Sequence, residues 1–152
     1  MKKQMLKTLS MTVITLTIVL ATAAVSTKAQ SIRRIDAQIP FEFVVGDKTM
    51  AAGEYSVLST TQDGSALTIR SANNSDSAIR LTNTMDSRRG DTRCRLVFHR
   101  YGQTYFLAEV WPSGGEGGRQ LLKSKAERAV QRELARVGHT GYDRVELVAV
   151  AR

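Results

Sequence analysis

The stretch from Cys94 to Trp111, which reads CRLVFHRYGQTYFLAEVW, constrains the fold more than any other part of this sequence. Two runs rich in valine, leucine and aromatic residues flank Gly102-Gln103. Glycine at the first of two linking positions is typical of a type II′ turn, because that position needs a positive φ. The stretch therefore predicts a β-hairpin in which Tyr101 pairs with Thr104.

This pairing predicts which side chains share a face of the hairpin, since successive residues of a strand point to opposite sides. The first predicted face carries Arg95, Val97, His99, Tyr101, Thr104, Phe106, Ala108 and Val110. The second predicted face carries Cys94, Leu96, Phe98, Arg100, Tyr105, Leu107, Glu109 and Trp111. Both faces carry large apolar side chains, so we expect central strands that are covered on both sides.

The hairpin also holds the candidate binding residues, which are His99, Tyr105, Glu109 and Trp111. The predicted register places His99 and Glu109 on opposite faces, which argues against a direct pair. Each needs a hydrogen-bond partner if it is buried, because an unpaired buried charge costs free energy. We expect a structural hydrogen bond or a position at the rim for both, and no catalytic residue is predicted.

Residues 1–29 have the features of a secretory signal peptide. Three lysines precede an apolar run from Met11 to Ala24, and Thr27-Lys28-Ala29 is a suitable cleavage site before Gln30. The alternative is an uncleaved membrane anchor, for which the run is short, since a spanning helix needs about 20 apolar residues. We therefore expect an exported protein that is periplasmic or secreted after cleavage, with no transmembrane span in the mature chain.

Removal of the signal peptide takes away four lysines and no acidic residue, which lowers the formal net charge from +8 to +4. A surface with this charge is ordinary, so nucleic acid is not an expected partner. Residues 30–152 are enough for a single β-rich domain with a hydrophobic core. Cys94 is the one cysteine of the chain, so no intrachain disulfide can form, and we expect it to be a small buried hydrophobic residue.

Short runs with period-two alternation, separated by turn residues, predict strands along most of the chain. The predicted strands cover residues 37–45, 54–59, 66–70, 78–82 and 144–151 besides the hairpin, and a flexible glycine-rich loop follows Trp111. Ser124 and Glu127 form a capping box, which predicts an amphipathic helix from about residue 125 to residue 137 that ends at Gly138. The predicted fold class is a small antiparallel β-sandwich or barrel of six to eight strands with one C-terminal helix.

Four segments of the chain resemble a group of small exported bacterial proteins to which no function is assigned. The segments read PFEFVVGDK (40–48), AGEYSV (52–57), LVFHRYG (96–102) and EVW (109–111). The resemblance covers most of the mature chain. It implies export and a small β-rich domain, and it carries over no catalytic residue.

The sequence favours a non-catalytic binding or structural module that is secreted or associated with the cell envelope. The first alternative is a carrier of a small apolar ligand or lipid, in which Tyr55, Phe98, Tyr105 and Trp111 line a barrel interior. The second is a small hydrolase or isomerase that uses His99 or Glu109. No cofactor is expected, and one cysteine with two distant histidines does not make a metal-ligand pattern. An anionic envelope polymer such as a polysaccharide, or anionic lipid, is a further partner suggested by the basic stripe of Lys125, Arg128, Arg132 and Arg136 on the predicted helix, and the alternative is a solvated helix face.

Overall fold

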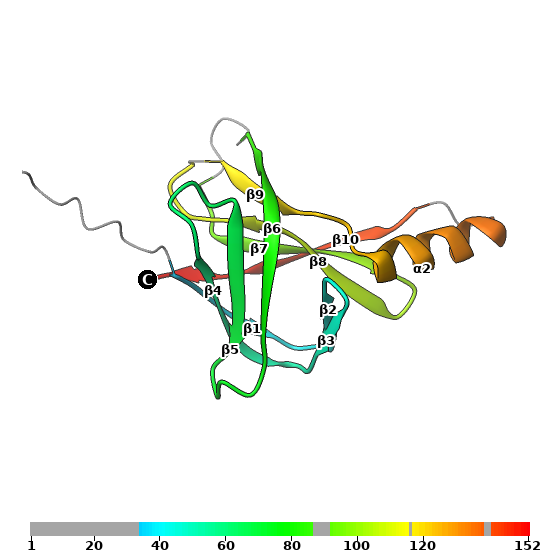
Figure 1. The fold of residues 1–152 in the computed structure, drawn as a ribbon, viewed down its shortest axis with the longest axis horizontal. Coiled ribbons are helices and arrows are strands. Elements are labelled where there is room, and N and C mark those ends of the chain that lie inside the picture. Colours follow the sequence, from blue (N-terminus) through cyan, green and yellow to red (C-terminus); the bar gives the residue numbers. More distant parts are fainter. Residues whose placement is uncertain (1–33, 87–91, 116, 139–140) are drawn as a thin grey trace, which may run out of the picture. The chain divides into compact units, whose positions relative to one another are not determined.

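The computed structural model of the protein describes residues 34–86, 92–115, 117–138 and 141–152, so the expected signal peptide lies outside the described residues. Within these ranges the chain forms 11 strands and one helix near the C-terminus, which confirms the predicted mainly β fold (Figure 1). The elements are β1 (Arg34–Ile39), β2 (Phe43–Val45), β3 (Lys48–Met50), β4 (Gly53–Ser59), β5 (Ala66–Ser71), β6 (Ser77–Met85), β7 (Arg95–Tyr101), β8 (Thr104–Trp111), β9 (Gly118–Leu121), α2 (Lys125–Arg136), β10 (Asp143–Val148) and β11 (Val150–Ala151).

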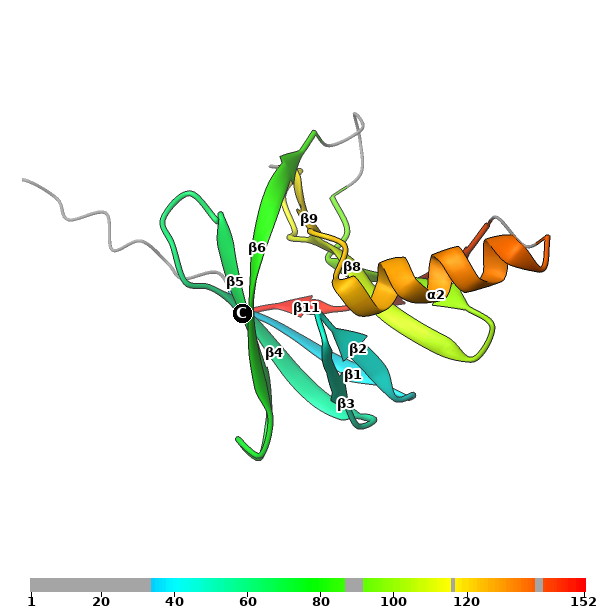
Figure 2. The same cartoon turned by 45° about the vertical axis from the view of Figure 1, so that its right-hand side comes forward.

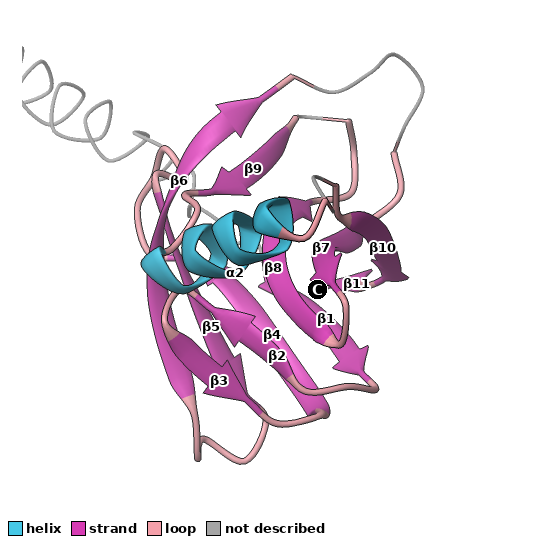
Figure 3. Cartoon of the chain, turned by 90° about the vertical axis from the view of Figure 1, so that its right-hand side faces the viewer, coloured by secondary structure: helices cyan, strands magenta, loops and turns pink. Residues whose placement is uncertain are grey.

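The strands are arranged as a β-sandwich (Figure 3). Neighbouring strands follow the order β10-β7-β8-β9-β6-β5-β4-β1-β11 and all of these pairs are antiparallel. β2 lies off this path, where it pairs with β3 and makes a parallel bridge to β8. β6 belongs to both layers, because its first half pairs with β5 and its second half with β9.

The C-terminal segment also pairs with both layers. β10 pairs with β7, whereas β11 pairs with β1 at the other end of the strand order. Ala149 lies between the two strands, and its N–H donates a hydrogen bond of 3.0 Å to the carbonyl of Cys94. The single strand predicted over residues 144–151 is therefore two short strands with different neighbours.

Besides the division of the C-terminal strand into β10 and β11, the number of strands exceeds the predicted six to eight for two reasons. The strand predicted over residues 37–45 is divided at Pro40 into β1 and β2, because proline has no N–H to donate to a ladder. β3 and β9 are short strands of three and four residues in segments for which no strand is predicted. β9 begins at Gly118, the last residue of the predicted glycine-rich loop, and continues to Leu121.

The hydrophobic core lies between the layers and is filled by aromatic and aliphatic side chains. The ring of Phe43 lies 5.6 Å from that of Phe98 and 5.0 Å from that of Tyr55, both edge to face. Exposure of these three side chains is at most 3%. Burial of each stabilises the fold by roughly 1.5–3 kcal/mol, so this cluster is a main source of stability.

The central hairpin has the predicted turn and a different register beyond it. Tyr101 pairs with Thr104, and φ is +62° at Gly102. Phe98 pairs with Leu107 but Val97 pairs with Glu109, so Ala108 is an extra residue, a β-bulge, in β8. From Glu109 onward, the side chains of β8 therefore point to the face opposite to the one that regular alternation predicts. The predicted faces of Glu109, Val110 and Trp111 are therefore wrong, and Glu109 shares its face with His99.

Helix α2 begins where the capping box predicts. The Ser124 hydroxyl accepts the N–H of Glu127 at 3.0 Å, and the helix ends at Arg136, one residue before the predicted end. Glu127 is the buried residue of α2, and the C-terminal end of the helix extends beyond the turn of the central hairpin (Figure 2). Within the described ranges, no helix combines the length and the apolar character that crossing a membrane requires.

Candidate functional site

The bulge divides the central hairpin into an apolar face and a polar face. The apolar face carries Leu96, Phe98, Leu107 and Val110, which belong to the core between the layers. The polar face carries Arg95, His99, Tyr101, Glu109 and Trp111, all of which are buried. A buried face with this many polar groups is the strongest candidate site of the described chain, because buried polar groups need specific partners.

His99 forms a buried pair with the first turn of α2. Its Nδ1 lies 3.0 Å from Oε1 of Glu127, and both residues are 4% exposed. The Tyr101 hydroxyl donates to the same oxygen at 3.2 Å. The Glu127 carboxylate therefore joins α2 to β7, rather than reaching back to the helix start as the capping box predicts.

Tyr142 covers this pair from the segment before β10. Its ring lies 3.8 Å from the imidazole of His99, centroid to centroid, and the Lys123 ammonium lies 5.6 Å from the Tyr142 ring. Burial, and then the negative charge of Glu127, raise the pKa of the Tyr101 hydroxyl above its ordinary value. The Tyr101 phenol is therefore a hydrogen-bond donor at neutral pH and not a base.

Glu109 is held by two partners on the same face. Its carboxylate accepts two hydrogen bonds from the Arg144 guanidinium, at 3.0 and 2.9 Å, and one from the Trp111 indole N–H at 2.7 Å. Arg144 also donates to Glu146 at 3.0 Å. A two-pronged arginine–carboxylate pair is among the stronger ionic contacts in proteins, so Glu109 fixes β10 and the Trp111 side chain against β8.

The Trp111 ring is packed on two sides. The guanidinium carbon of Arg95 lies 4.7 Å from its centroid, which is cation–π geometry. On the β9 side, a Cβ added to Gly118 would lie 2.7 Å from the indole ring. Only glycine leaves room for the indole there, which explains why a glycine begins β9 and why this strand was hard to predict.

Tyr105 does not belong with the other three candidate residues. It lies on the side of Phe98, and its ring stacks on Phe41 with centroids 4.0 Å apart. The aromatic set proposed for an apolar ligand is therefore divided. Tyr55 and Phe98 are in the filled core, Tyr105 lies at its edge, and Trp111 lies on the polar face.

Sequence reasoning placed His99, Glu109 and Trp111 in one hairpin and missed their partners. Glu127 had a local signal as a capping residue, but nothing in the helix pattern indicated His99 as its contact. Arg144 and Glu146 alternate in a predicted strand, which is typical of one polar face. That this face lies against Glu109 depends on the pairing of β10 with β7, which is a long-range contact.

The polar face has the residue types of an acid–base site but little room for a substrate. A carboxylate that holds one imidazole nitrogen orients the other nitrogen for proton transfer. In this structure the Tyr142 ring lies over that imidazole, and both members of the pair are buried. Burial raises the pKa of the Cys94 thiol, which fits an inert core residue. Within the described ranges, no cluster of His, Cys, Asp or Glu has the geometry of a metal site.

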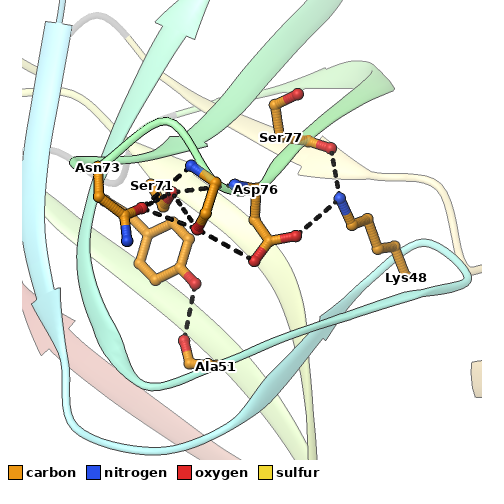
Figure 4. A network of polar contacts seen from close by, with 8 residues as sticks. Lys48, Ala51, Ser71, Asn73, Asp76 and Ser77 are labelled. Atoms are coloured by element: carbon orange, nitrogen blue, oxygen red, sulfur yellow. Dashed lines mark hydrogen bonds and ion pairs between the residues drawn. The ribbon is translucent and has the colours of Figure 1, made fainter.

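A second polar network lies at the turn between β5 and β6 (Figure 4). The Asn73 side-chain oxygen accepts the hydroxyls of Ser71 and Ser75 at 2.6 and 2.8 Å. Lys48 forms an ion pair of 2.9 Å with Asp76, and this contact lowers the pKa of the Asp76 carboxyl. These contacts stay within the turn or join it to β3, so they fix the shape of the turn.

Comparisons of the chain with models of protein families, with curated proteins and with solved structures give no match.

Proposed function

We propose that this protein is an exported, non-catalytic β-domain that serves as a binding or structural module, in the cell envelope or secreted. The observation that carries the proposal is the use of the two charged candidate residues, His99 and Glu109, as contacts between elements of the fold. His99 holds α2 through Glu127, and Glu109 holds β10 through Arg144. Both side chains are buried in these contacts, as buried polar groups are when they have partners, and on this proposal their task is to position α2 and β10.

The packing of the proposed carrier residues supports a module over a carrier of apolar ligands. Carrier sites are cavities that enclose most of the ligand and are lined by aromatic side chains. Phe98 and Tyr55 are both in contact with Phe43 and are almost fully buried by protein. Trp111, the fourth aromatic residue of the carrier hypothesis, lies on the polar face, where it contacts the Arg95 guanidinium and donates a hydrogen bond to Glu109.

The second candidate is a small hydrolase or isomerase, and the His99–Glu127 pair is the observation that favours it. An imidazole oriented by a carboxylate is the usual general base of acyl transfer. Such a base must reach the proton that it abstracts in a plausible substrate position. The Tyr142 ring occupies the space over the imidazole, so this candidate requires Tyr142 to move away.

Native mass spectrometry of the protein from the exported fraction of its own host tests the proposal. We expect a chain cleaved near residue 29 that carries no retained small molecule. A retained apolar molecule that is lost in Phe43→Ala would contradict the proposal and support the carrier.

The enzyme alternative has its own test. Wild-type protein and His99→Gln are assayed on activated ester substrates, with Tyr142→Ala as a variant that uncovers the imidazole. We expect no turnover above buffer for any of the three proteins. Turnover that increases in Tyr142→Ala and disappears in His99→Gln would contradict a non-catalytic role.

A further inference from the structure

The exposed side of α2 carries the most concentrated positive charge among the described elements. Lys125, Arg128, Arg132 and Arg136 are all exposed and recur at intervals of three or four residues. This spacing places them along one side of the helix. The buried Glu127 points to the opposite side, where it contacts β7. The side of α2 with Glu127 therefore attaches the helix to β7, and the side with the four basic residues faces solvent.

These four cations are not neutralised by nearby acids. Within the described ranges, none of the four takes part in an ion pair. The one other acidic residue of the helix, Glu133, is exposed and makes no ion pair with any residue that the structure describes. Lys125, Arg128 and Arg132 also line an open groove along the helix, together with Gln131. A row of unpaired cations on a surface attracts anions from solution.

The dimensions of the row fit an extended polyanion. With a rise of 1.5 Å per residue, the four cations span about 16 Å and follow one another at about 4.5 to 6 Å. This interval is comparable with the length of one sugar ring in a polysaccharide chain. A globular anion would contact only one or two of the cations, whereas an extended chain with an acid group on successive sugars contacts all four.

The composition of this side argues against insertion into a lipid bilayer. The residues beside the four cations on the exposed side are Ala129 and Ala135, which are small. Helices that bind bilayer surfaces place large apolar side chains such as leucine, phenylalanine or tryptophan at the lipid boundary. The apolar residues of α2 with larger side chains, Val130 and Leu134, are half-buried on the opposite side.

The attachment of α2 keeps the row in a fixed position. The Ala126 N–H donates to Asp47 at 3.1 Å, and Ser124 and Glu127 hold the first turn. The four cations are exposed over the length of the helix, whose C-terminal end extends beyond the turn of the central hairpin (Figure 2). A preformed row loses less conformational entropy on binding than cations on a flexible segment.

We infer that the exposed side of α2 is a binding surface for an acidic polysaccharide. The inference rests on the proposed role as a non-catalytic binding module. The four cations contact successive acid groups of the polymer, and the Glu127 contacts hold the helix in place. The interaction is electrostatic, so we expect added salt to weaken it. At physiological ionic strength, dissolved ions screen charges that lie more than about 8 Å apart.

Fluorescence anisotropy of labelled dextran sulfate with the full chain tests the inference. We expect saturable binding that weakens at least tenfold in the triple variant Arg128→Gln, Arg132→Gln and Arg136→Gln. The matched control removes the same charge from the sandwich, with Arg34→Gln, Arg70→Gln and Arg152→Gln. We expect the control to bind within twofold of the wild-type protein, and circular dichroism confirms that both variants are folded.

Several outcomes would overturn the inference while leaving the proposed function intact. One is equal loss of dextran sulfate binding in the two triple variants, which would indicate attraction by net charge alone. Another is tighter binding of phosphatidylglycerol vesicles or of a single-stranded oligonucleotide, with the same dependence on the α2 arginines. Uncharged dextran that binds as well as dextran sulfate would also contradict an electrostatic surface. The proposed function would fail on different measurements, namely a retained apolar molecule in native mass spectrometry or turnover of activated esters.

Discussion

The two faces of the central hairpin are equally buried but are stabilised in different ways. The apolar face packs Phe98 and Leu96 against side chains from the other layer and needs volume and exclusion of water. The polar face needs two partners from other elements. Glu127 of α2 must lie within hydrogen-bond distance of His99, and Arg144 of β10 must lie within hydrogen-bond distance of the Glu109 carboxylate. The comparison teaches that a hydrophobic pattern can specify one face of a strand, whereas the other face depends on positions set by distant elements.

The largest expected effect comes from removal of the bulge that separates the two faces. Insertion of an alanine between Val97 and Phe98 would give Ala108 a partner and restore strict alternation, which turns Glu109 toward the apolar core while Val110 turns outward. Burial of an unpaired carboxylate then costs more than about 5 kcal/mol of stability. We expect an unfolded or aggregated protein, seen by circular dichroism and gel filtration.

The control for this insertion is Ala108→Gly, which keeps the number of residues in both strands of the hairpin. We expect this variant to fold with a loss of about 1 kcal/mol or less. A folded insertion variant with native tryptophan fluorescence would show that the bulge does not determine the face of Glu109.

Truncation on the apolar face tests its dependence on volume. Phe98 is fully buried, so Phe98→Ala is expected to lower the free energy of unfolding by about 3–5 kcal/mol in urea. Phe98→Leu keeps most of the volume and is expected to cost less than about 2 kcal/mol. Equal losses in the two variants would mean that ring contacts, rather than volume, determine the stability of this face.

Truncation on the polar face tests its dependence on partners. Glu109→Ala leaves the Trp111 indole N–H and the Arg144 guanidinium without their acceptor, at an expected cost of about 2–3 kcal/mol. The expected cost is below that of Phe98→Ala because Arg144 is partly exposed and can be hydrated. Urea denaturation followed by tryptophan fluorescence measures both the stability and the environment of Trp111.

The matched variant Glu109→Gln keeps an oxygen acceptor and removes the charge. We expect about half of the loss seen in Glu109→Ala, since hydrogen bonds to charged groups are roughly twice as strong as neutral ones. A glutamine variant that is as unstable as the alanine variant would show that only the charge matters.

The smallest expected effect is a dependence of stability on alkaline pH. The folded pKa of Tyr101 is raised by burial and by Glu127, and that of Tyr55 by burial and by Asp76. The unfolded chain therefore ionises first, so this stability is complete below about pH 10 and is lost as the pH rises toward the folded pKa values.

Urea denaturation between about pH 8 and about pH 11 measures this dependence, since free tyrosine ionises near pH 10. Tyr101→Phe should flatten the alkaline slope, and Tyr55→Phe should flatten it less. A slope that is unchanged in Tyr101→Phe would show that the Glu127 contact does not couple to titration of this phenol.

Local sequence signals predicted much of the fold. Gly102 marks the hairpin turn, and Ser124 marks the start of α2 within one residue. These signals act over a few residues and need no knowledge of distant strands. The strand predicted over residues 37–45 runs through Pro40, whereas the chain forms two separate strands on the two sides of this proline.

The candidate site was less predictable because its geometry comes from non-local contacts. Nothing in the residues around Ala108 distinguishes a bulge from regular alternation, so Glu109 was placed on the wrong face. Glu127 was interpreted through its capping role alone, although its carboxylate contacts β7. β9 was missed since a strand that begins with Gly118 has the composition of a loop, and its glycine is explained only by the Trp111 ring beside it.

The division of the C-terminal segment between two layers has a consequence for the timing of folding. β7 lacks one neighbour and β1 lacks another until residues 143–151 have left the ribosome. Ile35 pairs with Ala151. A residue near the start of the described chain therefore cannot form this pair until a residue near its end has been synthesised. Contacts between such distant residues form late because closing a long loop costs entropy. The nascent chain thus stays open along two strand edges until this segment has been synthesised.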